Sequence, residues 1–280
     1  MTRGKQLQHA LTAITAALLV GAYVAPGNAE PGPVMAATTA LVRGDSVVPS
    51  VMTAVRAART RDAATEAALA ALASEVRRTS HPRALEDAFR GYFAYRAAHP
   101  EATENPYLYF VDYGLPSSTP RGYVFDMQRL AVVDGPFTVA HGRGSAASAD
   151  GVPQRFSNRT GSAATSLGLF VAQELYAFRG KSAGQAYRSV GLRLKGVSGD
   201  WNDNARARGV VAHGAPYVTA AKAGRSEGCP AVEPGRAERL LPKLANGGMV
   251  FLFAPNEEWM ARDPWLAAAA AAVGEAIGTT

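Results

Sequence analysis

The chain has 280 residues and only one cysteine, Cys229. One cysteine cannot form an internal disulfide, which excludes the small disulfide-stapled folds that are common among exported proteins. Three uses remain for the thiol: a small buried apolar side chain, a bond to another chain, or chemistry. The residues around Cys229 indicate which of these three uses applies.

Long apolar runs are also scarce. The most marked run, residues 11–24, is too short for a bilayer span of about 20 residues. It follows two basic residues and precedes a short stretch of small residues that ends at Ala29, which is the pattern of a secretory signal. We expect residues 1–29 to be a signal peptide and the protein to be exported to the periplasm or cell envelope. No membrane span is expected after cleavage.

The excess of positive charge is small. The net charge of +6 is spread along the chain, without a basic run or a basic-aromatic motif of a nucleic-acid module. We therefore expect no nucleic-acid partner and a mild preference for anionic surfaces such as a cell wall. The sequence does not indicate an oligomeric state.

Metal-binding spacings are missing as well. His141, His213, Cys229 and Asp203 are possible ligands, but neither His-x-x-x-His nor Cys-x-x-Cys occurs in the chain. We predict neither a metal nor a cofactor.

What is present divides the chain into a helical part and a strand-rich part. Apolar residues recur at helical spacing around Leu72 and again around Phe89, with Pro82 marking a break between the two segments. From residue 107 onward, runs of aromatic and β-branched residues predict strands. These predicted strands are residues 107–113, 122–127, 131–140, 209–213 and 249–254. The Gly- and Ser-rich residues 142–168 between them are typical of a long loop that shapes a site.

We therefore predict an α+β protein with a β-rich domain of mixed sheets preceded by a small helical region. The predicted boundaries are a signal peptide at 1–29, a linker and helical accessory region at 30–104, a catalytic domain at 105–256 and an Ala-rich C-terminal tail at 257–280.

Cys229 lies between Gly228 and Pro230, 16 residues after His213, which closes a predicted strand. A glycine before a nucleophile leaves room for an acyl group, and the backbone N–H groups of Gly228 and Cys229 can face a developing oxyanion. A strand-loop-strand return can bring His213 to the thiol and allow the imidazole to deprotonate it. The pair is chemically sufficient for acyl transfer.

A serine hydrolase is the competing interpretation, because the residues from Gly224 to Gly228 match the nucleophile elbow G-x-S-x-G, with Ser226 at its centre. That fold requires a histidine after the serine, and no histidine follows Ser226 in the chain. The elbow must also open a helix, whereas prolines at 230 and 234 interrupt the residues that follow. The chain order argues against this alternative.

Six ordered blocks between residues 105 and 254 resemble the YkuD-like murein L,D-transpeptidases. They are Phe137-Thr138-Val139-Ala140-His141-Gly142, Phe156-Ser157-Asn158, Thr165-Ser166-Leu167-Gly168, Asn202-Asp203-Asn204-Ala205-Arg206, His213-Gly214-Ala215 and Gly224-Arg225-Ser226-Glu227-Gly228-Cys229-Pro230-Ala231. Six blocks in order make a specific signal, which a single block would not.

The resemblance implies that Cys229 accepts the acyl group of a peptidoglycan stem peptide, that His213 is the base, and that the carbonyl of Gly214 orients the imidazole. D-Ala is released, and a second stem receives the acyl group in a 3-3 crosslink. Three residues, Arg225, Ser226 and His141, are candidates for binding the substrate.

Two points remain open at this stage. Many relatives have histidine where this chain has Glu227, whose carboxylate would raise the pKa of the thiol unless it points away or pairs with Arg225. A polar cluster that includes Arg206 and Arg208 fits either a clamp for stem carboxylates or a structural network. An L,D-carboxypeptidase, in which water resolves the acyl-enzyme, and a non-catalytic wall-binding protein are the alternative functions.

Overall fold

The computed structural model describes residues 47–102 and 104–267. The chain divides into two compact units, residues 1–49 and 50–280, and the second is described here. The predicted signal peptide lies outside the described residues, and so do residues 30–46 of the predicted linker and helical region. Within the described residues no helix combines the length and the apolar character that a bilayer crossing requires.

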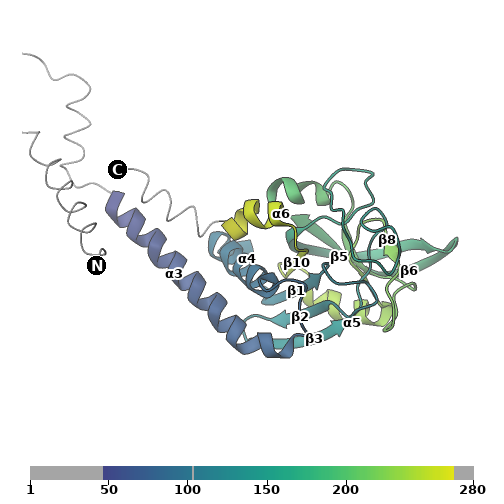
Figure 1. Ribbon diagram of the computed structural model, residues 1–280, viewed down its shortest axis with the longest axis horizontal. Coiled ribbons are helices and arrows are strands. Elements are labelled where there is room, and N and C mark those ends of the chain that lie inside the picture. The colour runs from purple at the N-terminus through teal and green to yellow at the C-terminus, as the bar shows by residue number, and fades with distance from the viewer. Residues whose placement is uncertain (1–46, 103, 268–280) are drawn as a thin grey trace, which may run out of the picture. The chain divides into compact units, whose positions relative to one another are not determined.

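The centre of the domain is an eight-stranded mixed sheet with the order β3-β2-β1-β10-β5-β6-β7-β9 (Figure 1). The strands are β1 (Tyr107–Asp112), β2 (Gly122–Asp126), β3 (Ala131–Phe137), β5 (Gly168–Ser182), β6 (Gln185–Gly196), β7 (Val211–Gly214), β9 (Ala231–Val232) and β10 (Met249–Phe253). Two neighbouring pairs, β1 with β10 and β7 with β9, run parallel. A second, smaller sheet joins β4 (His141–Gly142) to β8 (Arg225–Ser226), also in parallel.

Helices cover both faces of the main sheet. Successive residues of a strand point to opposite faces, so Val124 and Phe125 of β2 lie on opposite faces of the sheet. Phe125 meets Phe89 of α4 (Ala84–Ala98) edge to face, with ring centroids 5.4 Å apart. Val124 packs with Leu240 and its neighbours on α5 (Pro234–Leu244). Helices α4 and α5 therefore bury the sheet between them, and the α+β architecture with a preceding helical region is confirmed.

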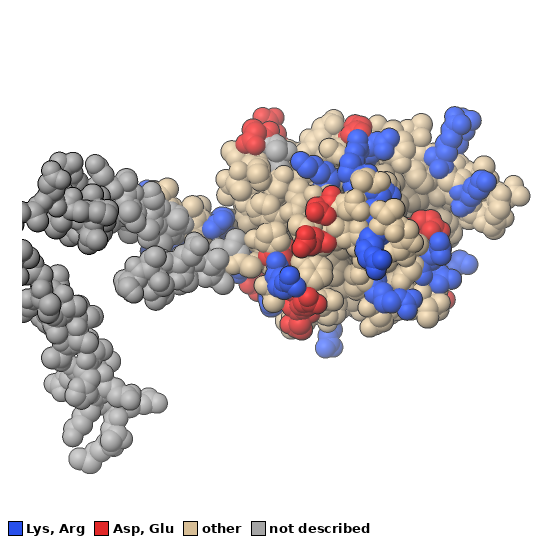
Figure 2. All heavy atoms as spheres, turned by 90° about the horizontal axis from the view of Figure 1, so that it is seen from above, with Lys and Arg blue, Asp and Glu red and all other residues tan. Residues whose placement is uncertain are grey.

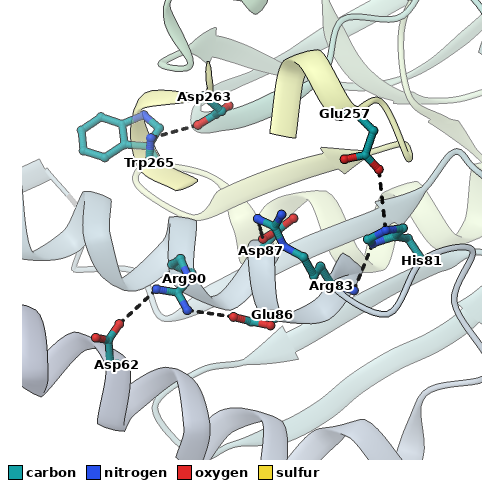
Figure 3. A network of polar contacts seen from close by, with 9 residues as sticks. All are labelled: Asp62, His81, Arg83, Glu86, Asp87, Arg90, Glu257, Asp263 and Trp265. Atoms are coloured by element: carbon teal, nitrogen blue, oxygen red, sulfur yellow. Dashed lines mark hydrogen bonds and ion pairs between the residues drawn. The ribbon is translucent and has the colours of Figure 1, made fainter. Parts of the chain in front are cut away.

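Charged side chains join the helices of the helical region to one another and to α6 (Figure 3). Helix α3 (Val47–Leu72) lies beside α4, where Arg90 contacts Asp62 of α3 at 3.1 Å and Glu86 of its own helix at 2.8 Å. His81, in the turn before α4, approaches Glu257 of α6 (Glu257–Arg262) at 3.9 Å. The contacts of Arg90 lie within the helical region, and the contact between His81 and Glu257 links that region to α6.

Asp87 is a buried carboxylate in this network. Its side chain is fully buried, one oxygen accepts from Arg83 at 3.0 Å, and the other has no hydrogen-bond partner among the described residues. Burial raises the pKa of Asp87 from 3.8 to about 6, while the Arg83 guanidinium acts in the opposite direction. Between about pH 6 and pH 3.8 the folded protein therefore holds a proton at this site that the unfolded chain does not.

Asp87→Asn is expected to change how stability depends on pH. Because the pKa is raised by folding, Asp87 makes the wild type more stable as pH falls from about 6 to 3.8, and the variant lacks this gain. The difference in free energy of unfolding between wild type and variant should move by roughly 2 kcal/mol in favour of wild type between pH 7.5 and 4.5. Urea unfolding at both pH values measures it, and an unchanged difference would contradict the raised pKa.

Five predicted strands are present as β1, β2, β3, β7 and β10, with shifted ends. The prediction missed β5 and β6, which form the longest hairpin of the sheet, from Gly168 to Gly196. Beyond the part flanked by β10 and β7, this hairpin continues as two strands alone, from Ala177 to Val190. Figure 2 shows lysine and arginine side chains spread over one face of the molecule, including the end that carries this hairpin in Figure 1.

The beginning of the predicted C-terminal tail is part of the packed domain. Residues 257–267 contain α6, and Trp259, Met260 and Leu266 are buried. The indole of Trp259 donates to Asp263 at 2.9 Å. The prediction of an Ala-rich tail is therefore wrong for these residues, and the rest of it lies outside the described residues.

Candidate active site

Strands β7 and β9 bring His213 and Cys229 into the same neighbourhood. In the parallel pairing His213 lies opposite Ala231, and its backbone N–H donates to the carbonyl of Pro230 at 3.4 Å. Cys229 immediately precedes Pro230, so it enters the sheet beside the histidine. The strand-loop-strand return that the sequence predicts is therefore formed by two adjacent parallel strands.

The thiol of Cys229 is partly buried in a cavity of about 290 Å³. Its Sγ atom is 4.0 Å from the carbonyl oxygen of Gly209, and the backbone of Val211 hydrogen-bonds to it. Burial raises the pKa of Cys229 above its ordinary value of 9.0, and the Glu227 carboxylate adds to the rise. The Val211 backbone and the Arg208 guanidinium lower the pKa. At neutral pH the thiol is therefore protonated and needs a base.

The imidazole of His213 is buried, neutral and held in one orientation. Its side chain is buried, and its ring stacks on Phe178 of β5, with centroids 4.1 Å apart and planes 16° apart. Burial lowers the pKa of His213 to about 4, although the hydrogen bond to Gly214 opposes this shift. Nδ1 is 3.0 Å from the carbonyl oxygen of Gly214, which can only accept, so Nδ1 carries the proton. The imidazole is neutral at physiological pH, and its Nε2 lone pair is available for a proton.

The turn before the nucleophile depends on Gly228 and Ser226. Gly228 has φ of +122°, and a Cβ atom there would lie 2.8 Å from the carbonyl oxygen of Ala164. Its backbone N–H donates to Ser226 Oγ at 3.1 Å, and the Ser226 hydroxyl donates to the carbonyl of Cys229 at 2.7 Å. The sequence predicted both Gly228 and Cys229 as oxyanion donors. In this conformation the Gly228 N–H is already used, which leaves the N–H of Cys229 as the candidate.

Ser226 has no features of a nucleophile. Its hydroxyl is committed to the backbone bonds just described and is buried. Strand β9 follows it, and α5 begins only at Pro234. The sequence argument that prolines prevent a helix here was wrong, because Pro234 occupies the first turn of α5, where proline is tolerated. The conclusion still holds, because Ser226 is not at a strand-to-helix turn.

Arg208 is a cation beside the nucleophile. Its Nη1 and Nη2 groups donate to Ser157 O, Ser166 Oγ, Ser162 Oγ and Ala164 O, at 2.5–3.1 Å. All four acceptors are uncharged, and no carboxylate among the described residues lies within ion-pair distance of Arg208. A Cβ atom on Gly228 would lie 3.6 Å from its Nη2. Its charge is therefore available to the Cys229 sulfur, a role that the sequence did not suggest.

Arg208→Gln is expected to make the thiol less reactive. Removing the positive charge removes one of the causes that lower the pKa of Cys229, so the pKa rises further and less thiolate is present at pH 8. Alkylation of Cys229 by iodoacetamide at pH 8 should slow by about tenfold. Arg206→Gln is the matched control, because Arg206 is exposed and contacts Glu174. Equal alkylation rates in the wild type and both variants would exclude the electrostatic role.

The rest of the polar cluster is structural. Asn202 is buried, and its side chain bonds to the backbone of Ser198, Leu167 and Leu169 at 2.8–3.0 Å. The side chain of Asp203 accepts from Asn158 at 2.6 Å. Neither the clamp nor the network hypothesis describes the whole cluster, because Arg208 alone among these residues lines the cavity.

The three predicted substrate-binding residues are not among those that line the cavity. His141 is fully buried, with Nδ1 at 3.1 Å from the buried Arg121, and burial together with Arg121 lowers the pKa of His141 to about 4. Arg225 donates to the carbonyl of Ala147 at 3.1 Å and so holds the long loop. Ser226 shapes the turn. Their common position on the paired strands β4 and β8 points to support of the nucleophile turn rather than substrate contact.

Arg143 and Glu227 lie at the cavity instead, together with Thr160, Gly161, Ala163, Arg208, Gly209, Val210 and Cys229. The Arg143 Nε donates to both Glu227 oxygens, at 2.7 and 2.9 Å. The sequence left open whether Glu227 points away from the thiol or pairs with Arg225, and in the structure its partner is Arg143. Among the described residues no group of three or more His, Cys, Asp or Glu side chains is placed to hold a metal ion.

A thiol and a half-buried cation line one cavity, and a neutral imidazole lies on the strand next to the thiol; these are the parts that an acyl-transfer site requires. The model of the YkuD_2 family, L,D-transpeptidase catalytic domain, matches residues 77–253, and the chain belongs to this family. The match begins at residue 77 and so includes α4.

Solved structures similar to this chain include the Ldtfm–avibactam carbamoyl enzyme, with 14% identity over 55% of this chain and 50% of that one and a TM-score of 0.32. Another is the L,D-transpeptidase LdtMt1 in complex with imipenem, with 16% identity over 53% of this chain and 59% of that one, and a TM-score of 0.30. An L,D-transpeptidase from Xylanimonas cellulosilytica is 15% identical over 55% of this chain and 63% of its own, with a TM-score of 0.31. The chain thus spans half to three fifths of these relatives. A comparison with curated proteins found no match.

Proposed function

We propose that this protein is an exported peptidoglycan L,D-transpeptidase that forms 3-3 crosslinks through an acyl-enzyme on Cys229. The observation that carries the proposal is the position of Cys229: its thiol lines a cavity, and it lies two residues before β9, whose partner strand β7 carries the neutral, oriented imidazole of His213. The chain's family, L,D-transpeptidases, acts on peptidoglycan, which makes stem peptides the substrate class.

In the first half-reaction His213 Nε2 takes the thiol proton as the sulfur attacks the carbonyl between the L-centre of the diamino acid and D-Ala. The Cys229 N–H faces the oxyanion that forms, and the buried site makes such a hydrogen bond stronger than in water. His213 then gives the proton to the leaving amine, the carbon–nitrogen bond breaks, and D-Ala departs. The product is a thioester between Cys229 and the shortened stem.

In the second half-reaction the amine of another stem attacks the thioester and the carbon–sulfur bond breaks. Water at roughly 55 M competes for the same carbonyl, so transfer requires a bound and oriented amine. The long loop from Gly142 to Gly168 contributes Arg143, Thr160, Gly161 and Ala163 to the cavity wall, and a loop of this kind is well placed to hold an acceptor. Efficient hydrolysis instead would make the protein an L,D-carboxypeptidase.

Product analysis tests the proposal. Purified protein is incubated with tetrapeptide-containing peptidoglycan fragments, and the products are separated and identified by mass. We expect released D-Ala together with a 3-3 crosslinked dimer, with tripeptide as the minor product. Tripeptide alone at high acceptor concentration would assign a carboxypeptidase. No D-Ala release from a protein whose thiol still titrates would favour a wall-binding protein.

A further inference from the structure

The cavity holds a pair of opposite charges whose positions follow from the small sheet. Gly142 of β4 pairs with Ser226 of β8, and the next residue of each strand is Arg143 or Glu227. The Arg143 N–H donates to the Ser226 carbonyl at 2.8 Å, which fixes the backbone of the pair. Both side chains then emerge at the same end of two paired strands and line the cavity that contains Cys229.

The hydrogen bonds of Arg143 leave part of its guanidinium unused. Nε alone serves both oxygens of Glu227, and no bond from Nη1 or Nη2 to a described residue is present. Arg208, the other arginine of this cavity, has both Nη groups bonded to the protein. Of the two, Arg143 therefore has the donor edge that a carboxylate can still bind in a bidentate manner.

Stability does not account for the pair. The side chains of Arg143 and Glu227 are 60% and 71% exposed, and ion pairs between exposed side chains contribute little to folding. Exposure within a cavity does, however, make both charges accessible to a ligand. A carboxylate two residues from the thiol also adds to the rise in the pKa of Cys229, which is a cost to the nucleophile. A role in ligand binding would offset that cost.

A cation and an anion side by side match a ligand with the opposite charges at similar separation. We propose that Arg143 and Glu227 form the acceptor subsite, where Glu227 binds an ammonium group and Arg143 binds a carboxylate on the same carbon. This inference rests on the proposed function, and it specifies the acceptor as an amino acid end with both groups free. Such an end is carried by the diamino acid of a stem and by a free amino acid.

The transfer step then balances as follows. The acceptor ammonium loses one proton to water, its nitrogen forms a bond to the thioester carbon, and the carbon–sulfur bond breaks. A second proton leaves the nitrogen as the amide forms, and one proton returns to the Cys229 sulfur. Glu227 and Arg143 hold the acceptor over the carbonyl while water competes. They are positioning residues in this step and exchange no atoms with the substrate.

The test uses the full mature chain and measures the ratio of transfer to hydrolysis of the acyl-enzyme. The acceptor probes are D-leucine, its amide D-leucinamide, which lacks the carboxylate, and a tripeptide stem. In Arg143→Gln the ratio of D-leucine to D-leucinamide transfer should fall by about tenfold, and in Glu227→Gln transfer should fall by about tenfold for both probes. Arg159→Gln and Glu258→Gln are matched controls outside the cavity.

Each outcome decides the inference. If the natural acceptor is a stem peptide, Arg143→Gln should reduce transfer to the tripeptide stem as much as transfer to D-leucine. If the natural acceptor is a free amino acid, Arg143→Gln should reduce transfer to D-leucine alone. An unchanged probe ratio in Arg143→Gln, with acyl-enzyme still forming, would overturn the inference while leaving the proposed function in place. Absence of acyl-enzyme in the wild type would overturn the proposed function itself. Arg143→Lys, which keeps the charge and loses the bidentate edge, should recover part of the probe ratio.

Discussion

Cys229→Ala is expected to abolish covalent capture of a tetrapeptide stem. The chain has no other cysteine that could replace Cys229. The hydroxyl of Ser226, the serine of the competing interpretation, is bonded to Cys229 O and Gly228 N and is not available as a nucleophile. A thiol in reach of a neutral imidazole forms a thioester, and a methyl group cannot. Intact-protein mass spectrometry after incubation with the stem should show the acyl mass on the wild type and none on the variant. A carbapenem, which traps nucleophiles of this type, should give the same contrast.

Ser226→Ala is the control for this experiment. The structure assigns Ser226 to the turn, so the variant should still be captured, more slowly than the wild type because Gly228 loses a hydrogen-bond partner. Capture by Cys229→Ala, combined with no capture by Ser226→Ala, would replace the cysteine account with a serine one. Prior alkylation with iodoacetamide should block capture in the wild type.

His213→Ala is expected to slow acyl-enzyme formation by a factor of about 100 or more, which is the usual contribution of a positioned general base. The thiol of Cys229 has a raised pKa and is protonated at neutral pH, so the attack depends on proton removal. Stopped-flow or quenched mixing with mass detection measures the rate. His81→Ala is the matched control, since His81 contacts Glu257 of α6 and does not line the cavity. Equal losses in the two variants would mean that His213 acts through folding alone.

The pH profile separates a base from a structural histidine. Because burial lowers the pKa of His213 to about 4, the imidazole stays neutral above about pH 5, and the acylation rate should show no inflection near 6.5. In His213→Ala the rate should instead follow the thiolate and keep rising as pH approaches the raised pKa of Cys229. An inflection near 6.5 in the wild type would contradict the buried, neutral imidazole.

Much of the site could be predicted because its essential parts are local in sequence. His213-Gly214 ends a strand, and Gly228-Cys229 forms a turn whose positive φ only glycine adopts easily, so both carry a local pattern. Their meeting needed only one short return. The family resemblance adds order to these blocks, and the match over residues 77–253 confirms it.

The parts that escaped prediction depend on contacts between distant segments. The β5–β6 hairpin supplies Phe178, which stacks on His213 from 35 positions upstream, and its two-stranded arm has too mixed a pattern to be recognised as strand. Arg143 and Glu227 meet only because two strands of two residues each pair in parallel. Such short strands leave almost no period to detect.

Burial also changed the roles of polar residues. Arg225 and His141 look like substrate ligands in sequence, because both lie in blocks near the nucleophile. In the fold Nη1 of Arg225 bonds to loop carbonyls and Nδ1 of His141 contacts Arg121, while His141 Nε2 is buried without a partner among the described residues, and neither side chain lines the cavity. Arg208 is the opposite case, because in sequence it is one of several polar residues with no distinct role. Only the fold shows that it lacks a carboxylate partner among the described residues and keeps its charge beside Cys229.

A two-step trapping experiment tests the central claim most directly. The wild-type protein is mixed with a tetrapeptide stem, the covalent species is isolated rapidly, and the modified peptide is identified after proteolysis; a tripeptide stem is then added as acceptor. The account expects the acyl group on Cys229 and its transfer into a 3-3 dimer with return of the free thiol. An acyl group on any other residue, or a thioester on Cys229 that never passes to an amine at saturating acceptor, would contradict it.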